Sequence, residues 1–318
     1  MWKENIKKRI DELIVKSKNN GNYAIFDCDN TILMNDIQYA LMHYVLKFKK
    51  YRTTPQVLSD FLYKHFPAEE KVLSRFMEIF ERAYSVEYTS DVYLEFLANI
   101  EELVEYLFFK YDHFDITMIF FYDMSEEELR ALIQKAINYH NTIEFGYENW
   151  IYEDNISSYK TGLAIAKEME ELIKEFHEND IDVYVISGSP RIQVEEVLKP
   201  LHPYIKEIYG KELEFINEKI TGEIRKGTIE TYYEGKVEVI EKYIYPLYKK
   251  GPILVAGDSM GDYNMLTKYE DTEISLLIDR NRTGKFSELV EVNDDRYLSQ
   301  TVDETIGRFI DAEKSITF

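Results

Sequence analysis

Cysteine is nearly absent from the 318-residue sequence, which contains only one. A single cysteine excludes a framework of internal disulfides and is typical of proteins from a reducing compartment. Long apolar runs are also missing, and the longest, residues 116–122, is far too short to span a bilayer. Residues 1–20 are charged throughout, which is unlike a signal peptide. We therefore expect a cytoplasmic protein that has no membrane partner.

Basic tracts are absent as well. The sequence has 38 Lys plus Arg against 59 Asp plus Glu, which gives a formal net charge of -21. Such a charge argues against a nucleic acid as the partner. The length and a hydrophobic content of 45% are sufficient for a large core. Together they favour two domains.

What the sequence does contain is a short apolar segment, residues 23–26, that runs directly into Asp27, Asp29 and Thr31. Four consecutive apolar residues are typical of a strand that is buried on both faces of a parallel sheet. The two neighbouring carboxylates repel each other, and a hard cation such as Mg²⁺ would offset that repulsion. Asp and Asn are also ordinary turn residues, so this segment alone leaves both interpretations open.

Two later apolar segments end in the same way. Residues 181–186 lead into Ser187 and Gly188, and residues 252–256 lead into Gly257, Asp258 and Asp262. A fourth apolar segment covers residues 274–278, and helical segments alternate with the strands. This alternation predicts an α/β fold with a doubly wound, mostly parallel sheet. Because the carboxyl ends of parallel strands meet at one edge, the three polar turns should lie together.

Residues 37–155 differ from the rest of the chain. They contain more than half of the aromatic residues and show helix-start signals without a sustained strand pattern. We expect a helical cap domain at 37–155, inserted into a core domain formed by 1–36 and 156–318. We also expect a return strand at Tyr232-Tyr233, a kink near Pro246, and a closing helix that begins at the capping sequence of residues 301–304.

The order of the polar segments resembles the haloacid dehalogenase superfamily, and within it the phosphoserine phosphatase-like branch with a helical cap. The first motif of that family, DxDxT, matches DCDNT at 27–31, and the second matches VYVISGS at 183–189. The third is a lysine, here Lys236 in YEGKVEVI, and the fourth matches GDSMGDYNML at 257–266. The resemblance implies a Rossmann-like core and Mg²⁺ as the cofactor.

The same resemblance implies a role for each motif residue. Asp27 would be the nucleophile that forms an aspartyl-phosphate, and Asp29 would be the general acid and base. Phosphate-binding groups would come from Thr31, Ser187, Gly188 and Lys236. The implied metal site is Asp27, the carbonyl of Asp29, Asp258 and Asp262, although Asp262 would alternatively orient Lys236. Taken singly, Ser187 reads as a turn residue and Lys236 as a solvated helix residue.

The expected activity is the Mg²⁺-dependent hydrolysis of a phosphomonoester, with a small phosphorylated metabolite as the partner. The acid at Asp29 disfavours dehalogenation. A phosphotransferase, another hydrolase of this superfamily such as a phosphonatase, and a catalytically silent binding protein on this scaffold stay open. The cap is both acidic and aromatic, which favours a small cationic leaving group. Phosphocholine or another phospho-amine is therefore the first expectation for the substrate, ahead of phosphoserine. The sequence does not reveal the oligomeric state.

Overall fold

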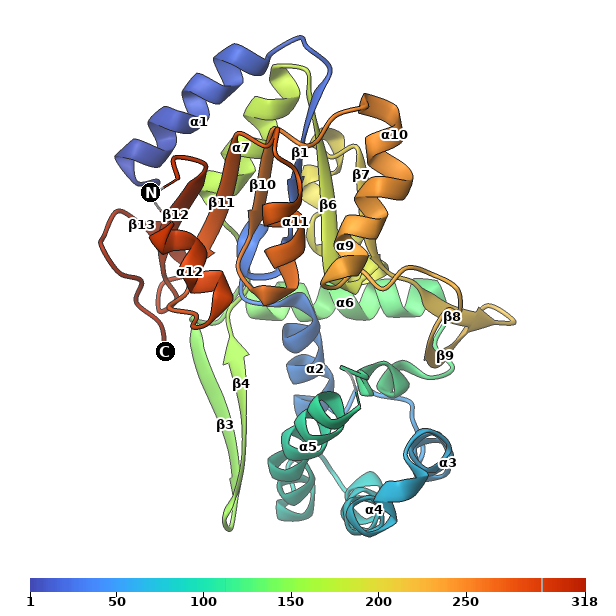
Figure 1. Cartoon of the computed structure of the whole chain (residues 1–318). Helices are drawn as coiled ribbons and strands as arrows, with labels where there is room; N and C mark the ends of the chain where they lie inside the picture. The colour runs from blue at the N-terminus through green and yellow to red at the C-terminus, as the bar shows by residue number, and fades with distance from the viewer. Residues whose placement is uncertain (112, 293) are drawn as a thin grey trace.

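The computed structural model describes residues 1–111, 113–292 and 294–318. A seven-stranded sheet forms its centre, in the order β13-β12-β11-β10-β1-β6-β7 (Figure 1). Neighbouring strands of this sheet run parallel, except for β12 and β13. The strands are β1 (Asn22–Phe26), β6 (Ile181–Pro190), β7 (Glu207–Lys211), β10 (Leu254–Gly257), β11 (Ile274–Asp279), β12 (Tyr297–Asp303) and β13 (Arg308–Ile310). The expected α/β fold with a mostly parallel sheet is confirmed.

Strand β1 lies in the middle of the sheet, between β10 and β6, and all of its residues are buried. Its side chains alternate between two apolar clusters, because Ala24 and Phe26 face one and Tyr23 and Ile25 face the other. The first cluster includes residues of α1 (Glu4–Ser17) and α7 (Lys167–Glu178). The second includes residues of α9 (Glu234–Val239), α11 (Tyr263–Lys268) and α12 (Lys285–Glu291). Helices on both faces explain why β1 is apolar at four consecutive positions, residues 23–26.

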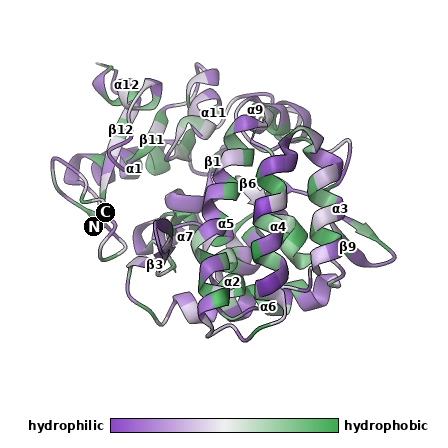
Figure 2. Cartoon of the chain, turned by 90° about the horizontal axis from the view of Figure 1, so that it is seen from below, coloured by the Kyte–Doolittle hydropathy of each residue, from purple (hydrophilic) through white to green (hydrophobic). Residues whose placement is uncertain are grey.

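The inserted residues form a helical layer beyond the carboxyl edge of the sheet (Figure 1). Its helices are α2 (Ile37–Lys47), α3 (Pro55–His65), α4 (Glu70–Tyr84), α5 (Asp91–Lys110) and α6 (Glu126–His140). Seen from below, they form one group (Figure 2). Many of the aromatic rings fill the interior of this group, where the ring centroid of Phe80 lies 5.2 Å from that of Phe96 and 6.4 Å from that of Phe120.

Within the described residues, no helix is both long and apolar enough to cross a membrane.

The insert is largely helical, as expected, but it also contains a hairpin that the sequence pattern did not indicate. Strands β3 (Gly146–Tyr152) and β4 (Asn155–Thr161) form an antiparallel hairpin that extends along the helices (Figure 1). Ile151 and Ile156 face each other near its tip and are exposed, so its hydropathy does not alternate as in a strand with one buried face. The proposed boundary at 155/156 falls within β4, whereas the boundary at 36/37 coincides with the start of α2. The division into domains stays a prediction.

The two connections between the insert and the core are joined to each other. Strands β2 (Leu33–Met34) and β5 (Ala164–Ile165) pair antiparallel. The side-chain amide of Asn35 donates hydrogen bonds to the carbonyl oxygens of Thr161 at 2.9 Å and Gly162 at 2.8 Å. Asn35 itself has a positive φ of 72°, which asparagine adopts more readily than most residues. These contacts fix where the first helix of the insert begins.

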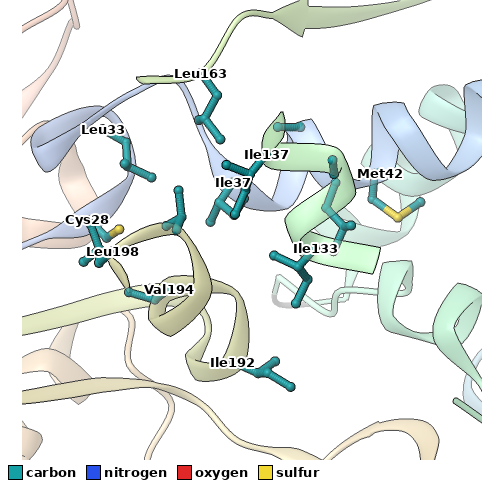
Figure 3. Packing of buried hydrophobic residues seen from close by; sticks show 14 of the residues in the cluster. Cys28, Leu33, Ile37, Met42, Ile133, Ile137, Leu163, Ile192, Val194 and Leu198 are labelled. Atoms are coloured by element: carbon teal, nitrogen blue, oxygen red, sulfur yellow. The ribbon is translucent and has the colours of Figure 1, made fainter. Parts of the chain in front are cut away.

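Apolar packing joins the insert to the core. Figure 3 shows residues from α2, α6 and the core helix α8 (Arg191–Val197) meeting in one cluster. The labelled members are Cys28, Leu33, Ile37, Met42, Ile133, Ile137, Leu163, Ile192, Val194 and Leu198. The thiol of Cys28 is buried here, directly after the first aspartate of the polar turn. Its surroundings explain why a small apolar side chain stands at this position.

Two other predictions differ from the structure near the C-terminal half. Residues 301–304 do not begin a helix, because Thr301 to Asp303 complete β12 and pair with β13. Tyr232-Tyr233 is not a strand but part of the turn that precedes α9. The kink near Pro246 is present, as a π-type turn at Ile240–Ile244 separates α9 from α10 (Tyr245–Tyr248). Proline cannot donate the helical hydrogen bond, which accounts for the break.

Two histidines are fully buried where α2, α6 and the hairpin meet. Nδ1 of His43 lies 3.2 Å from Nε2 of His140, and Nε2 of His43 lies 3.1 Å from Oε2 of Glu148. Burial, and after it the neighbouring His43, lowers the pKa of His140 to about 3. The folded protein therefore keeps His140 neutral at a pH where the unfolded chain already binds a proton.

This depressed pKa predicts that the free energy of unfolding decreases as the pH is lowered. Above pH 6.5, the ordinary value, both states carry neutral His140 and the group has no effect. Below it only the unfolded chain gains the proton, so the free energy of unfolding should fall by about 2 kcal/mol between pH 6.5 and 5. Urea unfolding at several pH values would measure this slope. His140→Gln should flatten it and His202→Gln, at an exposed position, should not; equal slopes in both variants would contradict the prediction.

Candidate active site

The turn after β1 carries the first two aspartates. The amide of Asp27 donates to the carbonyl of Ala256 at 2.9 Å, so the strand pairing with β10 continues up to Asp27. Asn30 then adopts a positive φ of 59°, which turns the chain so that Asp29 and Thr31 remain buried. The hydroxyl of Thr31 has no hydrogen-bond partner among the described residues. An unpartnered buried hydroxyl is available to a ligand.

Lys236 lies between two of the aspartates. Its ammonium donates to Oδ1 of Asp27 and to Oδ1 of Asp262, each at 2.6 Å, and its side chain is only 2% exposed. Burial alone would lower the pKa of Lys236, but Asp262 and Asp27 outweigh that effect and raise it. Burial raises the pKa of Asp27, and Asp262 adds to the rise, although Lys236 opposes it. The three groups form one buried network with an excess of negative charge.

The turn after β10 holds the other two aspartates. Oδ2 of Asp262 accepts hydrogen bonds from the amides of Asp258 at 3.0 Å and Ser259 at 3.1 Å. A Cβ atom at Gly257 would stand 2.5 Å from Cβ of Asp262, so this tight turn requires glycine. Asp262 is thus fixed by the backbone, with its second oxygen directed at Lys236.

Three of these carboxylates suit a divalent cation. Asp27, Asp258 and Asp262 each offer an oxygen, these oxygens lie within 4.8 Å of one another, and all three residues are buried. Mg²⁺ prefers carboxylate oxygens, and it would supply the positive charge that the network lacks. The carboxylate of Asp29 is not in this group. A contribution from Asp29 would come only from its carbonyl oxygen, as the resemblance implied.

Asp29 instead faces the turn after β6 and the first helix of the insert. Its Oδ2 accepts from the hydroxyls of Ser189 at 2.7 Å and Ser187 at 3.2 Å, and its Oδ1 accepts from the amide of Ile37 at 2.8 Å. Burial, followed by the charge of Asp36, raises the pKa of Asp29 to about 7. At that pKa a carboxyl group can both give and take a proton near neutral pH.

The turn after β6 provides further polar groups. Ser187 is fully buried, its hydroxyl accepts from the amide of Ser189 at 3.0 Å, and its carbonyl accepts from the hydroxyl of Thr231 at 2.5 Å. A Cβ atom at Gly188 would stand 3.3 Å from the ring of Tyr232, so little space remains beside it. Backbone and hydroxyl groups therefore line this side of the site, next to Asp29.

The structure thus brings the sequence-predicted residues together at one edge of the sheet. Asp27, Asp29 and Thr31 follow β1, Ser187 and Gly188 belong to β6, Asp258 and Asp262 follow β10, and Lys236 reaches in from α9. Their catalytic, phosphate-binding and metal-binding roles stay predictions.

Sequence reasoning missed three residues around this site. Ser189 binds Asp29, and Arg280 and Arg282 each lie 3.2 Å from Oδ2 of Asp258. The Ser-Gly-Ser sequence, and two arginines directly after the fourth predicted strand, were the available signals. They could not be interpreted without knowing that β11 lies next to β10.

The chain is similar in fold to solved structures. A crystal structure from Anaerococcus prevotii DSM 20548, described as a conserved functionally unknown protein, is 23% identical, with a TM-score of 0.86. That alignment covers 100% of this chain and 97% of the other, which shows a shared fold over the whole length.

More distant structures have named activities. A substrate-bound phosphoserine phosphatase is 15% identical, with a TM-score of 0.42, over 82% of this chain and 87% of that one. Cytosolic 5'-nucleotidase IIIB bound to cytidine is 15% identical, with a TM-score of 0.43, over 87% and 77%. No curated protein matches significantly. The sequence profile of the haloacid dehalogenase-like hydrolases matches residues 106–267, about half of the chain, and the chain belongs to this family.

Proposed function

We propose that this protein is a Mg²⁺-dependent phosphomonoester hydrolase that works through an aspartyl-phosphate intermediate. The observation that carries the proposal is the position of Asp27, which shares Lys236 with Asp262 and a possible cation site with Asp258 and Asp262. A second carboxyl group, Asp29, stands two residues away with a pKa raised to about 7 by burial. Phosphoryl transfer requires positioning and charge neutralisation, and these residues supply both.

In the first step, a carboxylate oxygen of Asp27 attacks phosphorus, and the bond from phosphorus to the leaving oxygen breaks. Asp29 gives its proton to that oxygen, so the product leaves as an alcohol. In the second step, Asp29 takes a proton from water, which attacks phosphorus and releases Asp27 and inorganic phosphate. Lys236 balances negative charge on Asp27 and the phosphoryl oxygens throughout. Mg²⁺, when bound, adds further charge neutralisation and orientation.

Phosphate oxygens require donors in addition to the ammonium group. Thr31 offers a hydroxyl that has no hydrogen-bond partner in the part of the chain that the structure describes, and Ser187 with the backbone around Gly188 offers further polar groups. Asp29 at this position disfavours dehalogenation, which needs no acid beside the nucleophile. A phosphotransferase would use the same first step, but in the second step another alcohol would take the place of water. A catalytically silent binding protein would carry out neither step.

Metal removal tests this function directly. We expect the purified protein to hydrolyse p-nitrophenyl phosphate with Mg²⁺, to lose this activity in EDTA, and to regain it when Mg²⁺ is added in excess. Mg²⁺ should also raise the melting temperature of the wild type more than that of Asp258→Asn, because binding to the folded state stabilises it. Activity that is indifferent to chelation, or no hydrolysis of any phosphomonoester, would contradict the proposal.

A substitution of Asp29 should separate good leaving groups from poor ones. Asp29→Asn cannot protonate the leaving oxygen, so turnover of ethyl phosphate should fall by about 100- to 10,000-fold. Nitrophenolate leaves without such help, so the first burst of nitrophenol should persist while hydrolysis of the intermediate slows. Stopped-flow absorbance with p-nitrophenyl phosphate measures both phases. Equal losses in the first step for both esters would exclude an acid role for Asp29.

A further inference from the structure

A cavity of about 470 Å³ opens beside the candidate site, at the junction of the insert and the core. Asn30 and Asp36 border it from the chain around Asp29, while Tyr147 and Lys160 come from the hairpin β3-β4. On the core side it is lined by groups that include Arg280, Arg282 and Glu304. Burial raises the pKa of Asp36 to about 6, and the nearby charges of Asp27 and Asp258 also raise it. Arg280 and Arg282 contact Asp258, so the cavity adjoins one of the proposed metal ligands.

The cations of this cavity are linked to the candidate metal site. Arg280 and Arg282 each place a guanidinium nitrogen 3.2 Å from the same oxygen of Asp258. Arg280 also pairs with Glu304, and Lys160 contacts the other oxygen of Glu304 at 2.7 Å. The side chain of Arg282 is 47% exposed, and Asp258 is its one carboxylate partner within the described residues. A loss of the contact with Asp258 would therefore leave Arg282 without a described carboxylate partner, whereas Arg280 would keep Glu304.

The acidic groups of the cavity already have partners. The carboxylate of Asp36 accepts from the amides of Gln38 at 2.7 Å and Tyr39 at 3.0 Å, where it caps α2. Glu304 binds Lys160 and Arg280. A cationic leaving group would meet three positive side chains here, whereas Glu304 already binds two of them and Oδ1 of Asp36 already accepts from two backbone amides.

We propose that the natural substrate carries a second anionic group on its leaving group, and that Arg282, with Arg280 and Lys160, binds that group in this cavity. The inference rests on the proposed phosphomonoesterase function and names its substrate class. Once Asp258 ligates a divalent cation, its oxygens neutralise the two guanidinium groups less. Arg282 then has only a weakened carboxylate partner and can turn into the cavity, where a carboxylate or second phosphate of the substrate provides a charge-assisted hydrogen-bond acceptor. This class differs from the cationic leaving group that the aromatic content of the insert favoured, and a comparison of the two kinds of ligand tests one against the other.

Binding to Asp27→Asn tests the proposal independently of turnover. Isothermal titration calorimetry in Mg²⁺ would compare phosphoglycolate and ethylene glycol bisphosphate, whose leaving groups are anionic, with two other esters. These are ethyl phosphate, whose leaving group is uncharged, and phosphoethanolamine, whose leaving group is cationic. At least one of the two anionic ligands should bind about tenfold more tightly than ethyl phosphate, the factor that one charge-assisted hydrogen bond provides. The two anionic arms distinguish a carboxylate from a second phosphate.

Adding Arg282→Gln should remove most of that preference, and Lys160→Gln should reduce it. Arg225→Gln is the matched control, because Arg225 is exposed and pairs only with Glu212 among the described carboxylates. Equal or tighter binding of ethyl phosphate or phosphoethanolamine would overturn the proposal, as would a preference that survives Arg282→Gln. Wild-type hydrolysis of p-nitrophenyl phosphate, measured in parallel, shows whether a failure lies in this inference or in the proposed function itself.

Discussion

Asp27→Asn should lower the turnover of every phosphomonoester by about 10,000-fold or more, which is typical of the loss of a covalent nucleophile. An amide has nearly the shape of a carboxylate but does not form the acyl phosphate. The fold should survive, because Lys236 keeps its contact with Asp262 at 2.6 Å when the partner at Asp27 becomes neutral. Steady-state kinetics, with circular dichroism to establish folding, would measure the effect.

The matched control is Asp60→Asn, which makes the same chemical change on the exposed side of α3. It should leave turnover unchanged. A folded Asp27→Asn protein that retains even a tenth of wild-type turnover would eliminate Asp27 as the nucleophile.

Lys236→Met should have the largest effect on stability. The substitution leaves Asp27 and Asp262 buried without their shared cation, and breaking a buried ion pair costs about 3–5 kcal/mol. Catalysis should be lost as well, because nothing balances charge on the nucleophile. Urea unfolding in EDTA would measure the change in the free energy of unfolding.

Lys242→Met, at an exposed position six residues further along the chain, in the turn Ile240–Ile244, provides the comparison and should change that free energy little. Mg²⁺ should recover more stability in Lys236→Met than in the control, because the cation then meets uncompensated carboxylates. A loss in Lys236→Met no larger than in Lys242→Met would show that the buried network does not support the fold.

The central sheet was predictable from sequence because its strands are buried on both faces. Such strands are uninterrupted apolar runs, and three of them end in polar turns that mark the functional edge. The hairpin β3-β4 and the closing strand β12 were not recognised. Ile151 and Ile156 are exposed in the first, so no buried face imposed an alternating pattern. In β12, residues 301–304 have the sequence of a helix cap, but residues 301–303 form a strand because they pair with neighbouring strands of the sheet.

In the candidate site, too, some residues were predictable from the sequence and others were not. Asp27, Asp29, Lys236 and Asp258 lie in motifs whose order and spacing are visible in the chain. Arg282 could not be recognised from the sequence, because it contacts the site only through Asp258 in the turn after β10. That contact exists because β11, which precedes Arg282, lies next to β10 in the sheet. The cationic leaving group that the aromatic content of the insert favoured stays a prediction, and rings such as Phe80 and Phe96 do not support it because they are buried in the core of the insert.

The most direct test of the central claim is a search for the covalent intermediate. The protein would be quenched in acid during turnover of p-nitrophenyl phosphate, digested, and analysed by mass spectrometry. We predict a peptide that contains residues 23–31 and carries the added mass of one phosphoryl group at Asp27, absent from Asp27→Asn. Full wild-type turnover with no phosphoryl group on this peptide, or with one on another residue, would contradict the account.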